Sequence, residues 1–88
     1  MKKYNANNVK HYLAQAIKDS GLTPAEAVAA AKANGRVALT DATIEAELAK
    51  KGWTAGGDVG GSMIEIGSVT YPADLLAARD LVAWMVGK

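Results

Sequence analysis

The chain of 88 residues has no cysteine, no phenylalanine, two prolines and a single histidine, His11. Without cysteine it can form no disulfide, no zinc–thiolate centre and no thiolate nucleophile. One histidine among scattered carboxylates provides none of the ligand spacings that are typical of metal sites. We therefore expect neither a metal nor another cofactor.

The chain also lacks an excess of charge of either sign and any long apolar run. Ten basic and nine acidic residues leave a net charge of +1, which produces no strong field toward nucleic acid or an anionic membrane. No run approaches the about 20 apolar residues that cross a bilayer, and no apolar signal segment follows Lys2 and Lys3. The expected location is the cytoplasm, without membrane or nucleic-acid partners.

Large apolar side chains are scarce, although half of the residues are apolar. Eighteen of the 44 apolar residues are alanine, which leaves 26 larger ones. A chain of this length buries only about 60–65% of its unfolded surface. We predict one domain, 1–88, of modest stability, which would gain from association with a partner or with a second copy.

Periodicity and capping signals predict four helices. The segments run from about Asn8 to Ser20, from Thr23 to about Asn34, from Thr40 or Asp41 to about Lys51, and over 72–86. The clearest local signal is "TPAE" at 23–26, which reads as a capping box with proline at the first helical position. In the third helix, Ile44 and Leu48 are the expected buried pair.

A hairpin is predicted between the third and the last helix. The runs "SMIEI" and "VTY" flank Gly67-Ser68, which suits a two-residue type II′ turn. This register pairs Ile66 with Val69 and Ile64 with Tyr71, so all four share one face. We expect that face to be buried, in which case Ile66→Asp would unfold the domain. Residues 53–55 are a candidate third strand, and 36–39 fit either a strand or an extended connection.

The glycine-rich stretch 56–61 raises the question of a phosphate-binding loop. A P-loop requires Lys-Ser/Thr after its last glycine, and a dinucleotide-binding loop opens a helix. Here no lysine follows and the next element is a strand. The stretch is therefore interpreted as a β-loop, either the tip of a wing or a connection that carries partner contacts.

No group of residues predicts catalysis. His11 falls opposite the apolar stripe of the first helix and is expected to be exposed. Ser62 lies in no nucleophile elbow, and Glu45 and Glu47 diverge on a helix. We predict a protein that is not an enzyme and acts by binding; a pocket that brought His11 together with an acid would argue against this.

Three helices followed by a hairpin also resemble a winged-helix DNA-binding protein. The reading helix would be the third, but its outward residues include Asp41, Glu45 and Glu47, which repel phosphates. The glycine-rich stretch 56–61, which would be the wing, holds Asp58 and no basic residue. DNA binding is therefore the alternative, with binding expected to be weak and unspecific, and a structural or assembly protein is a second alternative.

The stretch "SMIEIGSVTYPADLLAARDLVAWM" resembles in layout some small phage-encoded anti-defence proteins, anti-CRISPR proteins among them. The resemblance covers about 24 residues and includes no diagnostic motif. It implies inhibition of a host defence protein by direct binding. Because this chain is nearly neutral, the resemblance does not imply mimicry of nucleic acid.

The fold class predicted from these elements is α+β: about four helices, with a short antiparallel hairpin or a three-stranded meander before the last helix. On that helix Leu76 and Trp84 lie off the apolar arc. They fit either a surface for a protein partner or a homodimer, or a central helix buried on several sides. With Val59 and Trp53, they form the predicted partner interface.

Overall fold

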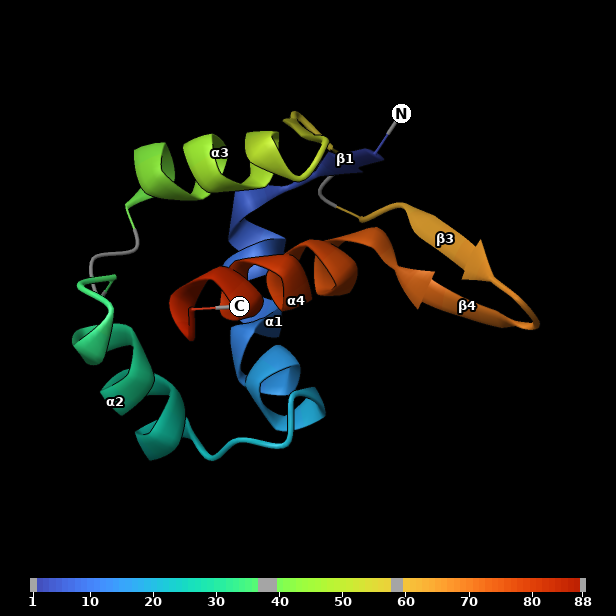
Figure 1. The fold of residues 1–88 in the computed structure, drawn as a ribbon. Coiled ribbons are helices and arrows are strands. Elements are labelled where there is room, and N and C mark those ends of the chain that lie inside the picture. The colour runs from blue at the N-terminus through green and yellow to red at the C-terminus, as the bar shows by residue number, and fades with distance from the viewer. Residues whose placement is uncertain (1, 37–39, 58–59, 88) are drawn as a thin grey trace.

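The computed structural model describes residues 2–36, 40–57 and 60–87, and in this part of the chain the predicted α+β fold is confirmed (Figure 1). Residues 37–39 lie outside the described residues, and with them the question of a strand at 36–39. The elements are β1 (Lys2–Tyr4), α1 (Ala6–Asp19), α2 (Pro24–Ala33), α3 (Asp41–Lys50), β2 (Trp53–Ala55), β3 (Met63–Ile66), β4 (Val69–Pro72) and α4 (Ala73–Met85).

The helix starts follow the local capping chemistry. The capping box of α2 is confirmed, because the Glu26 amide donates to the Thr23 hydroxyl at 3.2 Å and the Thr23 amide donates to the Glu26 carboxylate at 3.0 Å. Thr40 caps α3. Helix α1 begins at Ala6, two residues before the predicted start, because Asn5 accepts a hydrogen bond from the amide of Asn8.

The strands form two separate sheets. The predicted hairpin register is confirmed, with Ile66 opposite Val69 and Ile64 opposite Tyr71. The three-stranded meander is wrong, because β2 pairs in parallel with β1 at the start of the chain. Sequence reasoning missed β1, whose three residues are too few to show an alternation.

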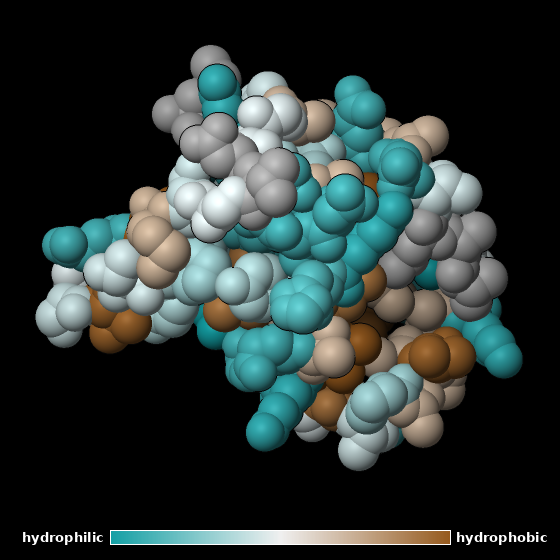
Figure 2. All heavy atoms as spheres, turned by 180° about the vertical axis from the view of Figure 1, so that it is seen from behind, coloured by the Kyte–Doolittle hydropathy of each residue, from teal (hydrophilic) through white to brown (hydrophobic). Residues whose placement is uncertain are grey.

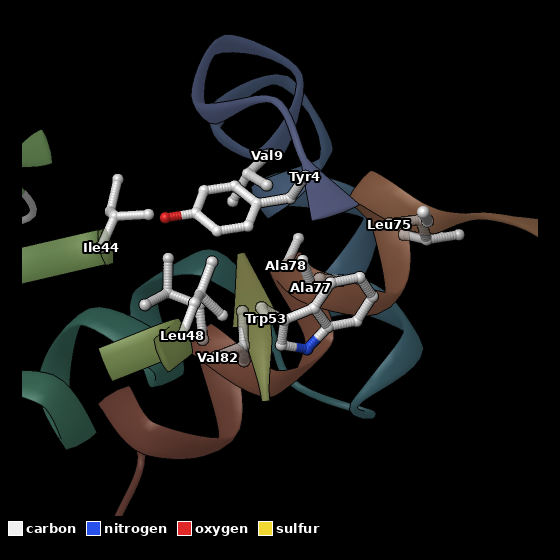
Figure 3. Packing of buried hydrophobic residues seen from close by; sticks show 12 residues of the cluster. Tyr4, Val9, Ile44, Leu48, Trp53, Leu75, Ala77, Ala78 and Val82 are labelled. Atoms are coloured by element: carbon white, nitrogen blue, oxygen red, sulfur yellow. The ribbon is translucent and has the colours of Figure 1, made fainter. Parts of the chain in front are cut away.

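Helix α4 is the centre of the domain, with α1 crossing it on one side and α3 with β1 on the other (Figure 1). Its buried side chains lie around much of its circumference. They include Leu75, Leu81 and Val82, together with three alanines and Asp74. The predicted buried pair Ile44 and Leu48 is confirmed. Figure 3 shows Tyr4 of β1 pointing toward Ile44, beside the residues of α4.

Trp53 belongs to this core. Its side chain is 4% exposed, and its indole Nε1 donates to the Asp80 carboxylate at 2.7 Å. Figure 3 shows the indole beside Ala77 and Ala78 of α4. The prediction from sequence placed Trp53 on a partner interface; the structure places it inside the domain, because the pairing of β2 with β1 turns it toward α4.

Tyr4 makes the stability of the domain sensitive to alkaline pH. Burial of its ring, followed by the negative charges of Glu45 and Asp41, raises the pKa of its phenol above the usual value of 10.0. The folded state therefore holds the proton more tightly than the unfolded state. The resulting stabilisation is fully present below about pH 10 and is lost as pH rises through the folded-state pKa.

We therefore expect the free energy of unfolding of the natural protein to fall faster above pH 10 than that of Tyr4→Phe, which keeps the ring and removes the titrating hydroxyl. Urea unfolding at pH 8 and at several values above 10 measures the difference. Parallel pH profiles for the two proteins would show that the phenol does not carry this dependence.

Candidate functional site: the projecting hairpin and the pockets at its base

The β3–β4 hairpin projects from the helical body as an arm (Figure 1). On its apolar face, Ile64 and Tyr71 lie near the body and are half-buried, and Ile64 packs against the core. The outer pair is open, with Ile66 54% and Val69 48% exposed. We call these four residues the hairpin face; the expectation that all of it is buried is wrong for its outer half, because the hairpin extends beyond the helices.

Figure 2, which views the molecule from behind, shows the arm with hydrophobic surface between its polar residues. The turn at its tip has the expected geometry, since Gly67 has a φ of 64° and Ser68 does not have positive φ. Such a turn holds the two strands in one register, so the open apolar pair at the tip is presented in a defined geometry.

The base of the arm is anchored to the body. The Ala73 amide donates to the Ser62 carbonyl at 2.7 Å, which extends the ladder to the start of α4. The Arg79 guanidinium lies 5.2 Å from the centre of the Tyr71 ring and donates to the Asp19 carboxylate at 2.7 Å. That hydrogen bond lowers the pKa of Asp19 below its usual value. The arm therefore has a fixed base and an apolar tip.

A pocket of about 200 Å³ at the base of the arm brings together His11, Ser62 and Asp74. Asp74 is 2% exposed, and its carboxylate accepts from the Asn5 amide at 2.8 Å and from the Asn8 side chain at 3.0 Å. Asp74 lies in the first turn of α4, where a negative charge is favourable. Its buried carboxylate also connects the starts of α1 and α4 through these hydrogen bonds.

This pocket does not assemble a catalytic triad. His11 is exposed, as predicted, and its ring meets the ring of Tyr12 edge-on. In the described part of the chain, no hydrogen bond joins the His11 imidazole to Ser62 or to Asp74. A nucleophile with a base requires the first of these bonds, and an oriented base requires the second. The pocket therefore holds the residue types of a hydrolase without their linkage.

A second pocket, of about 330 Å³, lies between β1 and β3. Lys2 and Lys3 line it together with Met63, Ile64 and Ala73. The Lys2 ammonium also donates to the carbonyl of Lys51 at 3.3 Å and lies 4.7 Å from the centre of the Trp53 indole. The pocket therefore combines cationic and apolar walls, and we call it the lysine groove. Sequence reasoning missed it because the two sides are 60 residues apart.

Of the four residues predicted as a partner interface, the structure describes three, and none of these three is fully exposed. Leu76 and Trp84 are half-buried and pack against the core. The Arg36 guanidinium covers the Trp84 ring at 5.2 Å and donates to the Trp84 carbonyl. Trp53 is buried, and Val59 lies outside the described residues.

The described part of the glycine stretch packs against β1. The Gly57 amide donates to the Tyr4 carbonyl at 2.8 Å, and a Cβ at Gly57 would lie 2.8 Å from the carbonyl carbon of Tyr4. Gly57 thus permits a close approach of two backbones, which is a structural role. Residues 58 and 59 of the stretch lie outside the described residues.

We expect Gly57→Ala to lower the free energy of unfolding by about 1–3 kcal/mol, since the added methyl must displace backbone rather than a mobile side chain. Gly60→Ala is the matched control, because a Cβ at Gly60 meets nothing within 4 Å. Urea unfolding measures both variants. Equal stabilities would mean that the contact between Gly57 and Tyr4 is not tight in solution.

Within residues 2–36, 40–57 and 60–87, no group of three or more histidine, cysteine, aspartate or glutamate side chains could hold a metal ion. No helix in this part of the chain has the length and apolar character needed to cross a membrane. Comparisons with protein-family models, with curated proteins and with solved structures found no match.

Proposed function

We propose that this protein is a small, non-catalytic binding module that docks the hairpin face on a protein partner. The observation that carries the proposal is the exposure of Ile66 and Val69 on an arm whose base is anchored by the Ala73–Ser62 hydrogen bond and the Arg79 contacts. Two β-branched side chains at a rigid tip lose little conformational entropy when they become buried.

The chemistry of the hairpin face favours an apolar site on the partner. None of its four residues is charged, and Glu65 with Thr70 lies on the opposite face. The layout resemblance to phage anti-defence proteins makes a host defence protein the first partner to test, and inhibition by direct binding in the host cytoplasm the first mode of action.

The chemistry of the arm does not favour the DNA-binding alternative. Residues 63–72 include no lysine or arginine, so the arm has no cation for a phosphate. On α3, Asp41 forms a salt bridge with Lys10, so the charge of that lysine is already paired. A gel-shift at physiological salt should show nothing tighter than about 10⁻⁴–10⁻⁶ M, the range of non-specific binding.

The double variant Ile66→Thr and Val69→Thr tests the hairpin face. Threonine keeps the β-branched shape that strands favour, so we expect unfolding energies within about 1 kcal/mol of the natural protein, in place of the unfolding predicted for a buried face. Binding should fall at least about tenfold, because each hydroxyl buried without a partner costs roughly 1–3 kcal/mol.

The measurement is affinity capture from the lysate of the encoding host, quantified by mass spectrometry, with the captured protein then titrated in purified form. The matched control is the double variant Glu65→Gln and Thr70→Ser, which changes the opposite face of the same arm. A partner retained by the control and lost by the threonine variant supports the proposal. A partner held equally by both variants would move the binding site away from the arm.

A further inference from the structure

The outer edge of β3 carries unpaired backbone groups. Ile66 and Val69 flank a two-residue turn and therefore exchange hydrogen bonds, as do Ile64 and Tyr71, the next pair of this kind. The amide and carbonyl groups of Met63 and Glu65 consequently point away from β4. In the described part of the chain this sheet has two strands, so no strand covers that edge.

The two edges of the hairpin differ. On β4 the outward backbone groups belong to Thr70 and Pro72, and proline has no amide hydrogen to donate. On β3, by contrast, both outward residues have one. Natural proteins protect open edges with charged side chains, especially lysine, with proline or with a bulge. The ladder of β3, with the sequence "MIEI", has one charged residue, Glu65, and neither lysine, proline nor a bulge. The edge of β3 is therefore the better template for a further strand.

The lysine groove lies along this same edge, since Met63 and Ile64 of β3 line it opposite Lys2 and Lys3. A strand added to β3 would enter the groove and bring its side chains next to Lys2 and Lys3, of which Lys2 already donates to the Lys51 carbonyl. An acidic side chain at that position would be complementary in charge. The chain itself contains such a strand: β3, with Glu65.

We propose that a second copy of this chain docks there, β3 against β3 in antiparallel orientation around a two-fold axis at Ile64. In this register Met63 faces Glu65 of the second copy, and the pairing is repeated by symmetry. Each Glu65 then lies beside the lysine groove of the other copy. The four strands form one sheet, in which the two hairpin faces become continuous on one side.

The symmetric register is consistent with the physics of small sheets. An isolated two-stranded hairpin is marginally stable, and four strands with a shared apolar side gain both pairing and burial. No like charges meet at the axis, because the residue on it is Ile64. This inference goes beyond the proposed function, which concerns the hairpin face and holds for a monomer as well as for a dimer.

Sedimentation equilibrium from about 10 μM to about 1 mM protein tests the association. We expect a monomer–dimer equilibrium, and amide hydrogen exchange at Met63 and Glu65 that slows as the concentration rises, while exchange at Thr70 stays unchanged. A monomer over the whole range would overturn the proposal. A dimer that protects other amides and leaves Met63 and Glu65 unchanged would overturn it as well.

Charge reversal tests the register. Glu65→Lys and Lys3→Glu should each weaken dimerisation at least about tenfold, since each places like charges together, and the combination of both should restore it. The control is Lys32→Glu on α2, which should have no effect. If the combined variant is as weak as the single ones, the pairing of Glu65 with the lysine groove is refuted. If the natural protein stays monomeric and still captures a foreign partner through the hairpin face, the proposed function stands while this inference fails.

Discussion

Replacing Trp53 by alanine should lower the free energy of unfolding by about 3–5 kcal/mol, the range for removing a large aromatic side chain from a core. The indole is 4% exposed and packs in the cluster that joins β1, α3 and α4. The substitution also leaves Asp80 without the 2.7 Å hydrogen bond from the indole nitrogen. A domain of this size has a total stability of about 4–13 kcal/mol, so the loss is a large part of it.

Urea unfolding followed by circular dichroism measures this effect at neutral pH. Trp53→Phe is the graded control, since phenylalanine keeps most of the apolar volume but not the hydrogen bond to Asp80, and it should lie between the natural protein and Trp53→Ala. A cost below about 1 kcal/mol for Trp53→Ala is typical of surface positions. That result would return Trp53 to the partner interface that its sequence context suggested.

Replacing Tyr4 by alanine should destabilise the domain by a comparable amount, about 3–5 kcal/mol. Tyr4 is 2% exposed, and it lies in the same core cluster as Ile44 and Leu48. Its backbone also holds the domain together, because its carbonyl accepts from Gly57 at 2.8 Å and it pairs with Ala55 in the parallel sheet. Loss of the side chain should loosen β1 as a whole.

Amide exchange separates this effect from a simple cavity. In Tyr4→Ala the amide of Gly57 should exchange faster, because its acceptor lies on the loosened strand, whereas amides inside α2 should keep their protection relative to the global unfolding energy. Tyr4→Phe should remain close to the natural protein at neutral pH. A Tyr4→Ala variant with natural stability would mean that β1 does not belong to the core.

The structural features that are stabilised by interactions between residues close in the sequence were predictable. The capping box at 23–26 and the turn at Gly67-Ser68 satisfy the hydrogen-bonding groups of the backbone within a few residues. The local sequence alone therefore predicted both correctly. Strand β1 was not predictable, since its partner β2 is about 50 residues away and three residues carry no pattern. The start of α1 depended on which asparagine became the cap. Asn5 has the extended backbone that a cap requires, whereas Asn7 and Asn8 lie inside the helix.

For the candidate site, the sequence by itself determined which residues share a face of the hairpin. It also determined that no residue of the hairpin face is charged. The tertiary structure decided exposure, because burial depends on where the helical body ends, and the body covers Ile64 but not Ile66. It likewise turned Trp53 inward by pairing β2 with β1, and it placed Lys2 and Lys3 beside β3. Local chemistry can be read from neighbouring residues, whereas burial and grooves are set by contacts between distant segments, which leave no periodic signal in a chain of 88 residues.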